Sequence, residues 1–138
     1  MQKGSMRMVT TDWVNKISEI TLFVEDLDRS KAFYQETFNL AIIYEDANCA
    51  VFDYGNTNIN LLNQSNADEL IDPAKVGRCG DGARFQFTIQ VPDVDRVCDE
   101  LAERGVTLLN GPITRTWGRR TACFADPDGH VWEIAQVL

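Results

Sequence analysis

The chain has 138 residues, of which 44% are hydrophobic and 25% are charged, and its formal net charge is −8. This length is sufficient for one domain with a substantial core. The negative charge argues against binding to nucleic acid or to anionic membranes, because both require clustered lysine and arginine. No stretch approaches the roughly 20 apolar residues of a membrane span. The four cysteines show no paired spacing, so we expect free thiols and a cytoplasmic location.

Residues 1–15 are polar and without pattern, and we expect a loose leader before a single domain at residues 16–138. Apolar residues at alternate positions within residues 17–24 predict a strand, with Glu19, Thr21 and Phe23 on the other face. Asp26 or Asp28 then caps a helix that runs to about residue 38. Three strands are expected at residues 41–44, 49–54 and 58–62.

Residues 64–82 are polar and rich in turn residues, and they predict a linker with one short helix at residues 67–71. A second strand is expected at residues 84–91. Asp93 or Asp95 then caps a second helix, and Gly105 ends it. Further strands are expected at residues 107–109, 120–125 and 130–136. The sequence Asp126-Pro127-Asp128-Gly129 between the last two predicts a tight turn.

An internal repeat relates the two halves. The phrase VEDLDR at residues 24–29 returns as VPDVDR at residues 91–96, 67 positions later. Both copies follow a strand and begin a helix, so the chain reads as two modules at about residues 17–63 and 83–137. Each module has the order strand, helix, strand, strand, strand, which predicts an α+β fold.

Four positions related by the repeat carry oxygen-bearing side chains. Glu19 and Gln86 lie at the repeat offset on the first strands, and Asn60 and Glu133 lie at a slightly larger offset on the last strands. Side-chain alternation predicts that they lie on the sheet face opposite the helix. These groups converge if the sheets curl around a common cavity.

The phrases VEDLDRSKAFY at residues 24–34 and FADPDGHVWE at residues 124–133 resemble the vicinal oxygen chelate superfamily. That superfamily includes glyoxalase I, bleomycin-resistance proteins, fosfomycin-resistance enzymes and extradiol dioxygenases. The resemblance implies two tandem βαβββ modules in a cup-shaped mixed sheet, a homodimer, and metal ligands on the first and last strand of each module. The positions that match are Glu19, Asn60, Gln86 and Glu133.

The ligand types depart from those of glyoxalase I, which has histidine or glutamine, glutamate, histidine and glutamate there. Only Glu133 is retained, and His130 is the single histidine of the chain. Iron held by two histidines and a carboxylate therefore cannot form within one chain, which argues against an extradiol dioxygenase. Oxygen donors suit Mg²⁺, Mn²⁺ or Ca²⁺. Ni²⁺ and Zn²⁺ are not distinguished from these, and the absence of any cofactor is the alternative.

If a metal binds, Glu133 is the candidate catalytic base and Glu19 is the alternative. Equally, Glu133 is a wall carboxylate bonded to a neighbouring strand. Arg120 either anchors an anionic ligand or pairs with a nearby carboxylate such as Asp126, and His130 is expected at the surface. The candidate ligand-binding residues are Thr21, Phe23, Thr88, Trp117 and Arg120; the aromatic ones serve equally well in a core or a dimer interface.

These residues favour a glyoxalase-like protein that binds a small oxygenated molecule and, if catalytic, is a metal-assisted lyase or isomerase. The alternative is a non-catalytic protein of the bleomycin-resistance type that sequesters a drug or antibiotic. A third hypothesis is a structural dimer with a vestigial cavity. The sequence leaves open whether the protein is an enzyme.

Overall fold

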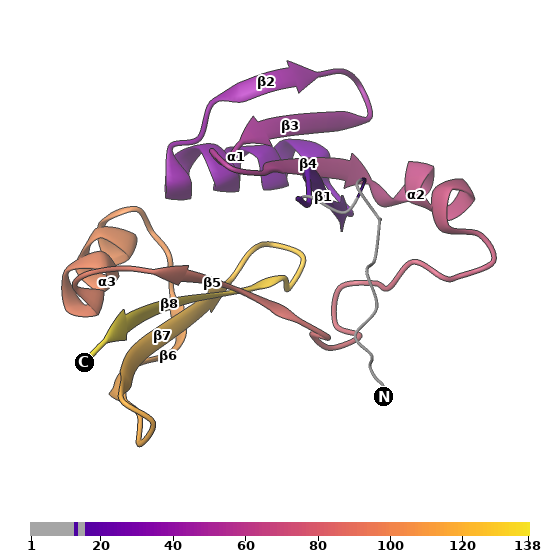
Figure 1. Ribbon diagram of the computed structural model, residues 1–138. Helices are drawn as coiled ribbons and strands as arrows, with labels where there is room; N and C mark the ends of the chain where they lie inside the picture. The colour runs from indigo at the N-terminus through magenta and orange to yellow at the C-terminus, as the bar shows by residue number, and fades with distance from the viewer. Residues whose placement is uncertain (1–12, 14–15) are drawn as a thin grey trace.

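Two βαβββ modules follow one another in the computed structural model, which describes Trp13 and residues 16–138 (Figure 1). The first contains β1 (Glu19–Val24), α1 (Leu27–Phe38), β2 (Ile42–Glu45), β3 (Cys49–Asp53) and β4 (Asn58–Asn63). The linker begins with α2 (Gln64–Ile71). The second contains β5 (Gln86–Gln90), α3 (Val94–Glu103), β6 (Leu108–Thr114), β7 (Arg119–Ala125) and β8 (Val131–Val137). Apart from Trp13, the expected leader lies outside the described residues.

The repeated phrase forms the same helix start in both modules. The Asp26 side chain accepts a hydrogen bond from the Arg29 N–H at 3.1 Å, and the Asp93 side chain accepts one from the Arg96 N–H at 3.2 Å. Both are N-caps, which satisfy donors that have no partner inside the helix. The first aspartate of each pair is therefore the cap.

The strands form two separate four-stranded sheets, with orders β1-β4-β3-β2 and β5-β8-β7-β6. In both, the first strand runs parallel to the last and the other pairs are antiparallel. The registers correspond, since Thr21 lies opposite Asn60 and Thr88 lies opposite Glu133. The α+β class and the tandem modules are confirmed, and the mixed sheet is divided between the modules.

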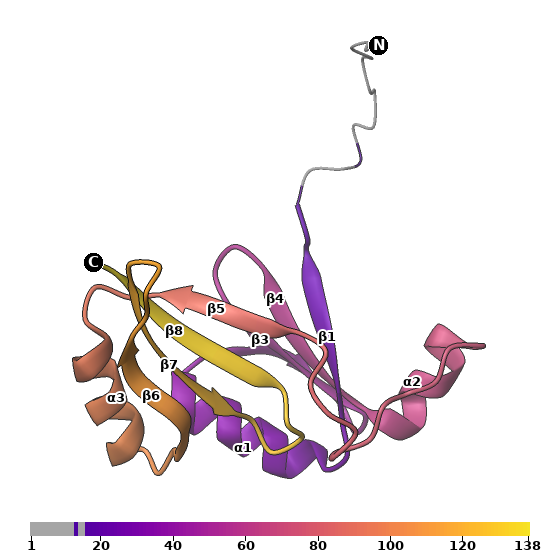
Figure 2. The same ribbon diagram turned by 90° about the horizontal axis from the view of Figure 1, so that it is seen from below.

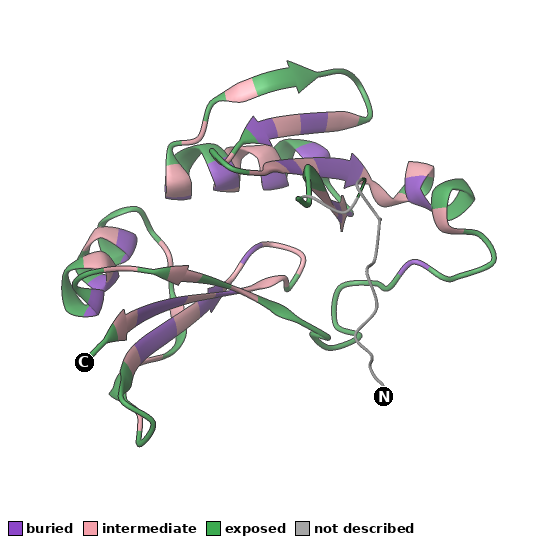
Figure 3. Ribbon diagram, in the orientation of Figure 1, coloured by how far each residue is buried: buried purple, intermediate pink, exposed green. Residues whose placement is uncertain are grey.

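One hydrophobic core unites the helix-bearing faces of both sheets. Its buried side chains include Phe52 and Leu61 of the first module and Phe124 and Ile134 of the second. The central strands of both sheets carry most of this burial (Figure 3). Because alternate residues point to opposite faces, the other face of each sheet points away from this shared core.

We call these two surfaces the open faces. The first open face carries Glu19, Thr21, Phe23, Asn58, Asn60 and Leu62, and the second carries Gln86, Thr88, Gln90, Val131, Glu133 and Ala135.

Helix α1 of the first module joins the two halves of the core. The rings of Tyr34 and Phe38 lie 6.1 Å and 4.8 Å from the Trp132 ring of β8. Aromatic pairs at these distances add to the free energy gained by burying apolar area. The modules are therefore packed on each other through α1.

Helix α2 lies at the opposite end of the molecule from α3 (Figure 2). It starts three residues earlier than expected, directly after β4. Its Ala67 forms a second buried cluster with Leu62 and Val76, against which Phe23 packs. The linker therefore covers one end of the first open face. Among the described residues, no helix is long and apolar enough to cross a membrane.

Strand β6 is longer and less regular than expected, with two register shifts against β7. Gly111 has a φ of 95°, and a Cβ atom there would lie 2.6 Å from the Ala122 Cα. Only glycine allows this conformation together with so close an approach. The irregular pairing allows the strand to continue to Thr114.

Candidate functional site

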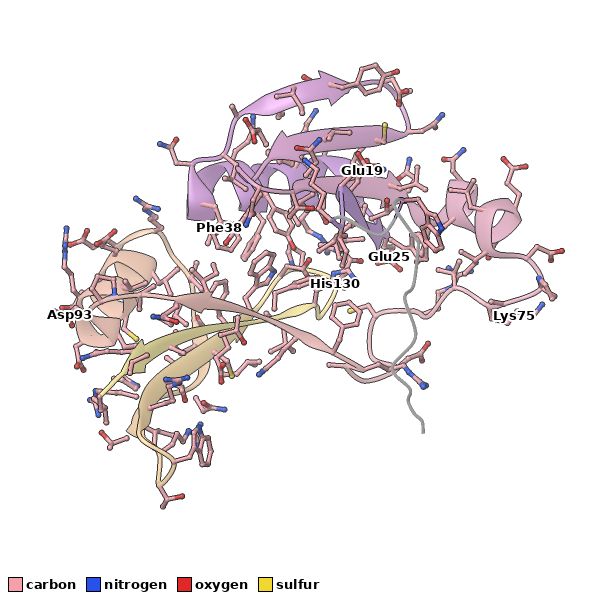
Figure 4. All side chains as sticks on the ribbon, in the orientation of Figure 1. Glu19, Glu25, Phe38, Lys75, Asp93 and His130 are labelled. Carbon is pink, nitrogen blue, oxygen red and sulfur yellow. The ribbon has the colours of Figure 1, made fainter. Side chains whose placement is uncertain are left out.

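The first open face holds Glu19 and Asn60 on neighbouring strands (Figure 4 labels Glu19). Glu19 is exposed, whereas Asn60 is half-buried. The Asn60 side-chain N–H donates to Thr21 Oγ1 at 3.4 Å, and the Asn60 Oδ1 atom is buried without a hydrogen-bond partner. A buried carbonyl oxygen without a donor costs about 1–3 kcal/mol. A donor group or cation at this position would therefore be stabilised.

The second open face holds Gln86 and Glu133 on β5 and β8. Gln86 is exposed and Glu133 is half-buried. The Thr88 hydroxyl donates to Glu133 Oε1 at 3.0 Å. This is the bond to a neighbouring strand that the non-catalytic interpretation of Glu133 predicts. It fixes the carboxylate and leaves Oε2 available to a ligand.

Within one chain the two pairs lie on different open faces. Each pair supplies one carboxylate and one amide oxygen. In the described part of the chain, no group of three or more histidine, cysteine, aspartate or glutamate residues is placed to hold a metal ion. Oxygen donors fit a hard divalent cation, but the two donors of one face would leave most coordination positions to water or substrate. The donor set is more complete if both open faces contribute.

Three of the expected ligand-binding residues lie on the open faces. Thr21 and Thr88 lie beside the oxygen pairs and bond to them. Phe23 lies on the first open face and packs against the cluster under α2. Trp117, in the turn between β6 and β7, is 68% exposed, so it lies at the margin.

Arg120 lies on the helix-bearing face instead. Its guanidinium donates twice to the Asp95 carboxylate, at 2.9 Å each. These bonds hold the pKa of the Asp95 carboxyl below its usual range. The expected pairing with a carboxylate is confirmed, but the partner is Asp95 and not Asp126. The alternation of β7 puts Arg120 opposite Gln136, whose side chain accepts a hydrogen bond from the Val94 N–H at the start of α3.

Arg115, which the sequence did not single out, reaches onto the second open face. It donates to Thr121 Oγ1 at 2.9 Å and to Asn110 Oδ1 at 3.2 Å, and its guanidinium lies 5.8 Å from the Trp117 ring centroid. Nothing in the sequence indicates this position, because it depends on the irregular pairing of β6.

A buried hydrogen-bond chain ends at His130. Asp126 Oδ2 accepts the Tyr34 hydroxyl at 2.7 Å and lies 2.7 Å from His130 Nδ1, while Trp132 Nε1–H donates to the Tyr34 oxygen at 3.2 Å. The His130 side chain is only 18% exposed, so the expectation of a surface residue is wrong. A histidine four positions after an aspartate across a tight turn could have indicated this contact.

Known proteins resemble this chain over most of its length. The sequence profile of the Glyoxalase/Bleomycin resistance protein/Dioxygenase superfamily matches residues 16–134. The uncharacterized protein YraH of Bacillus subtilis is 35% identical over 89% of this chain and 99% of its own length. The metallothiol transferase FosB of Lysinibacillus sphaericus is 27% identical over 88% of this chain and 82% of its own length.

The fold also matches solved structures. The crystal structure of a glyoxalase/bleomycin resistance protein/dioxygenase from Nocardioides superposes with a TM-score of 0.82 at 20% identity, over 90% of this chain and 84% of that one. At that identity, the agreement concerns the fold and not the activity.

Proposed function

Because the chain belongs to the Glyoxalase/Bleomycin resistance protein/Dioxygenase superfamily, we propose that it is a metal-assisted lyase or isomerase that acts on a small oxygenated substrate. The observation that carries this proposal is the pair of oxygen donors on each open face. Glu19 with Asn60 and Gln86 with Glu133 occupy equivalent strands, and the buried Asn60 oxygen has no partner.

We place the complete site between two copies of the chain. In a two-fold dimer, the first open face of one copy would meet the second open face of the other, and the same contact would occur twice. Each site would then have two carboxylates and two amide oxygens. Exposed apolar side chains at the margins, Tyr44 at 56% and Trp117 at 68%, are suitable for such an interface.

Glu133 would hold and move the proton. The Thr88 hydroxyl fixes its Oε1 atom, so Oε2 is the oxygen that takes a proton from a substrate carbon and returns it. Phe23 would supply an apolar wall, and Asn60 would turn its unpartnered oxygen toward the ligand. A divalent cation bound by these residues would act as a Lewis acid on adjacent substrate oxygens.

The relatives support metal chemistry and leave the substrate open. FosB is named a metallothiol transferase, and it aligns with 88% of this chain. The metal of the present protein, among Mg²⁺, Mn²⁺, Ca²⁺, Ni²⁺ and Zn²⁺, is to be identified by measurement. The four cysteines are free, which supports the proposal of a reducing, cytoplasmic location.

The first test is the metal content of protein purified without chelator or metal-affinity resin. We expect stoichiometric metal in the natural protein and its loss in both Glu133→Ala and Gln86→Ala. Gln90→Ala is the matched control, because Gln90 is an exposed glutamine on the same face of β5. Absence of metal after loading with each of the five cations would overturn the metal mechanism.

The second test asks whether two chains share the site. Glu19→Ala and Glu133→Ala chains are mixed, refolded together and separated as heterodimers. A shared site predicts that the mixed dimer regains one of two metal sites, since one interface then contains both natural carboxylates. Metal in the natural dimer but none in the mixed dimer, or a monomer in sedimentation, would contradict the shared site.

A specific observation favours the non-catalytic alternative. Glu133 already bonds to Thr88 as a wall residue would, so the open face could bind a drug or antibiotic without chemistry. The acidic charge of the chain would suit a cationic ligand. A thermal-shift screen with aldehydes, hydroxy acids and cationic drugs separates the two functions. Saturable binding without metal and without turnover would favour sequestration.

A further inference from the structure

A cavity of about 410 Å³ lies between the end of β1, the linker and the β7–β8 turn. This volume is in the range of small-molecule sites. Its lining contains none of the four oxygen-bearing residues of the open faces. The cavity therefore shares only Phe23 with the residues assigned to the proposed metal site and contains none of the metal-binding oxygens.

Three cationic side chains line the cavity: Lys75, Arg78 and Arg84. Among the described residues, none of the ion pairs involves any of them. The chain has a net charge of −8, yet this lining has three cations against two carboxylates, Asp81 and Asp128, and is locally positive. Such an arrangement attracts anions and raises their local concentration.

The two carboxylates of the lining are already engaged. Asp128 accepts hydrogen bonds from the Glu25 N–H at 2.9 Å and the Ser30 hydroxyl at 3.0 Å. Asp81 accepts one from the Arg78 N–H at 2.7 Å. These bonds fix the two acidic side chains in place without removing their charge, whereas the three cations have no carboxylate partner in the described part of the chain.

His130 adds a directed polar group from the turn, and Lys75 comes from the linker (Figure 4). Because the buried Asp126 carboxylate is an acceptor, His130 Nδ1 carries a proton and donates to it at 2.7 Å. The ring is thereby fixed, and no protein group in the described residues bonds to Nε2.

Two aromatic rings give the cavity an apolar wall. Phe23 and Phe85 belong to its lining, and the Phe85 ring stacks on the His130 ring at 6.2 Å with an interplanar angle of 21°. Phe85 is 52% exposed. A ligand with an apolar body would cover this surface and gain free energy in proportion to the area removed from water.

We propose that this cavity is a second binding site, for a small organic anion: a carboxylate or phosphate ester whose charge lies among Lys75, Arg78 and Arg84 and whose apolar body lies on Phe23 and Phe85. The site belongs to a single chain and does not depend on the metal.

The test is calorimetric titration of the full chain with benzoate, phenyl phosphate and inorganic phosphate, with neutral benzamide as the matched probe. We expect benzoate or phenyl phosphate to bind with a Kd of about 1 mM or tighter. In the double variant Arg78→Gln/Arg84→Gln, that Kd should rise about tenfold or more. Arg119→Gln is the control, because Arg119 is an exposed arginine outside the cavity.

The two ends of the ligand are tested separately. Phe85→Ala should weaken binding of benzoate and phenyl phosphate but not of inorganic phosphate. Glu133→Ala should leave all three unchanged, which separates this site from the proposed metal site. Equal binding of benzamide and benzoate, or an unaltered Kd in the double arginine variant, would overturn the proposal.

Cys79 provides a second readout. It is exposed and lines the cavity, whereas Cys123 lies on β7 outside it. A bound anion should slow alkylation of Cys79 by iodoacetamide and leave that of Cys123 unchanged, as measured by peptide mass spectrometry. Equal slowing at both cysteines, or slowing at neither with the probe at saturation, contradicts binding in this cavity.

Discussion

The β3–β4 turn and the β7–β8 turn occupy equivalent places in the two modules, yet their aspartates differ in burial. Asp53 is exposed and accepts one hydrogen bond in its turn, from the Gly55 N–H at 2.8 Å. Asp126 accepts the corresponding bond from the Asp128 N–H at 3.0 Å but is 5% exposed. It also bonds to the His130 N–H, the His130 ring and the Tyr34 hydroxyl.

This difference distinguishes what a turn requires from what a module interface adds. The bond from an aspartate to the N–H two residues later is local and occurs in both turns. The bond to Tyr34 exists only because α1 of the first module packs on the second sheet. The second turn therefore joins the modules, whereas the first only closes its hairpin.

The largest effect is expected from removing the buried aspartate. Asp126→Ala leaves the Tyr34 hydroxyl, the His130 ring and two backbone N–H groups without an acceptor, and we expect a loss of about 3 kcal/mol or more in the free energy of unfolding. Asp53→Ala, the matched change in the exposed turn, should cost much less. Urea unfolding of both variants measures the difference. Equal losses would show that Asp126 serves only its own turn.

Removal of the Tyr34 hydroxyl should have an intermediate effect. Tyr34→Phe deprives Asp126 of one donor and the Trp132 N–H of its acceptor, at about 1–2 kcal/mol. The control is Tyr44→Phe, because the Tyr44 hydroxyl bonds to Asp46 at the exposed surface. If both variants unfold at the same urea concentration, the buried chain does not stabilise the module interface.

The same tyrosine predicts a pH dependence. Burial, and then the charge of Asp126, raise the pKa of Tyr34 well above its usual value. As the pH rises, Tyr34 ionises in the unfolded chain before it does so in the folded chain. Its contribution to the free energy of unfolding is therefore fully present below about pH 10 and is progressively lost above it. Unfolding measured from pH 9 to 11 should lose stability more gradually in Tyr34→Phe. Identical pH profiles would contradict this assignment.

The smallest effect concerns the second aspartate of each repeated phrase. Asp95 binds Arg120 through two 2.9 Å hydrogen bonds, whereas Asp28 lies 4.0 Å from Lys31. Asp95→Asn should therefore lower the melting temperature at neutral pH slightly more than Asp28→Asn. Because Arg120 lowers the Asp95 pKa, this contribution is present at neutral pH and is lost as the pH falls through the lowered value. A difference that persists when both aspartates are protonated would have another cause.

The sequence predicted the helix caps and strand faces well because they depend on neighbouring residues. Alternation correctly grouped Glu19 with Thr21 and Glu133 with Ala135. It failed for the extent of β6, where Gly111 permits an irregular pairing. The sequence predicted a carboxylate partner for Arg120 but did not identify Asp95, because Asp95 lies 25 positions away on another element.

By itself the sequence determined a duplicated βαβββ chain and the four oxygen-bearing positions that its repeat selects. It did so because the alternation of side chains along a strand decides which face a residue occupies, and the offset of the repeat relates the equivalent positions of the two modules. Only the tertiary structure decided that α1 joins the two helix-bearing faces in one core, which divides the four positions between two open faces. It also decided that Asp126 is buried and fixes His130 beside a cavity. These outcomes depend on contacts between residues distant in the sequence, and no local pattern encodes them.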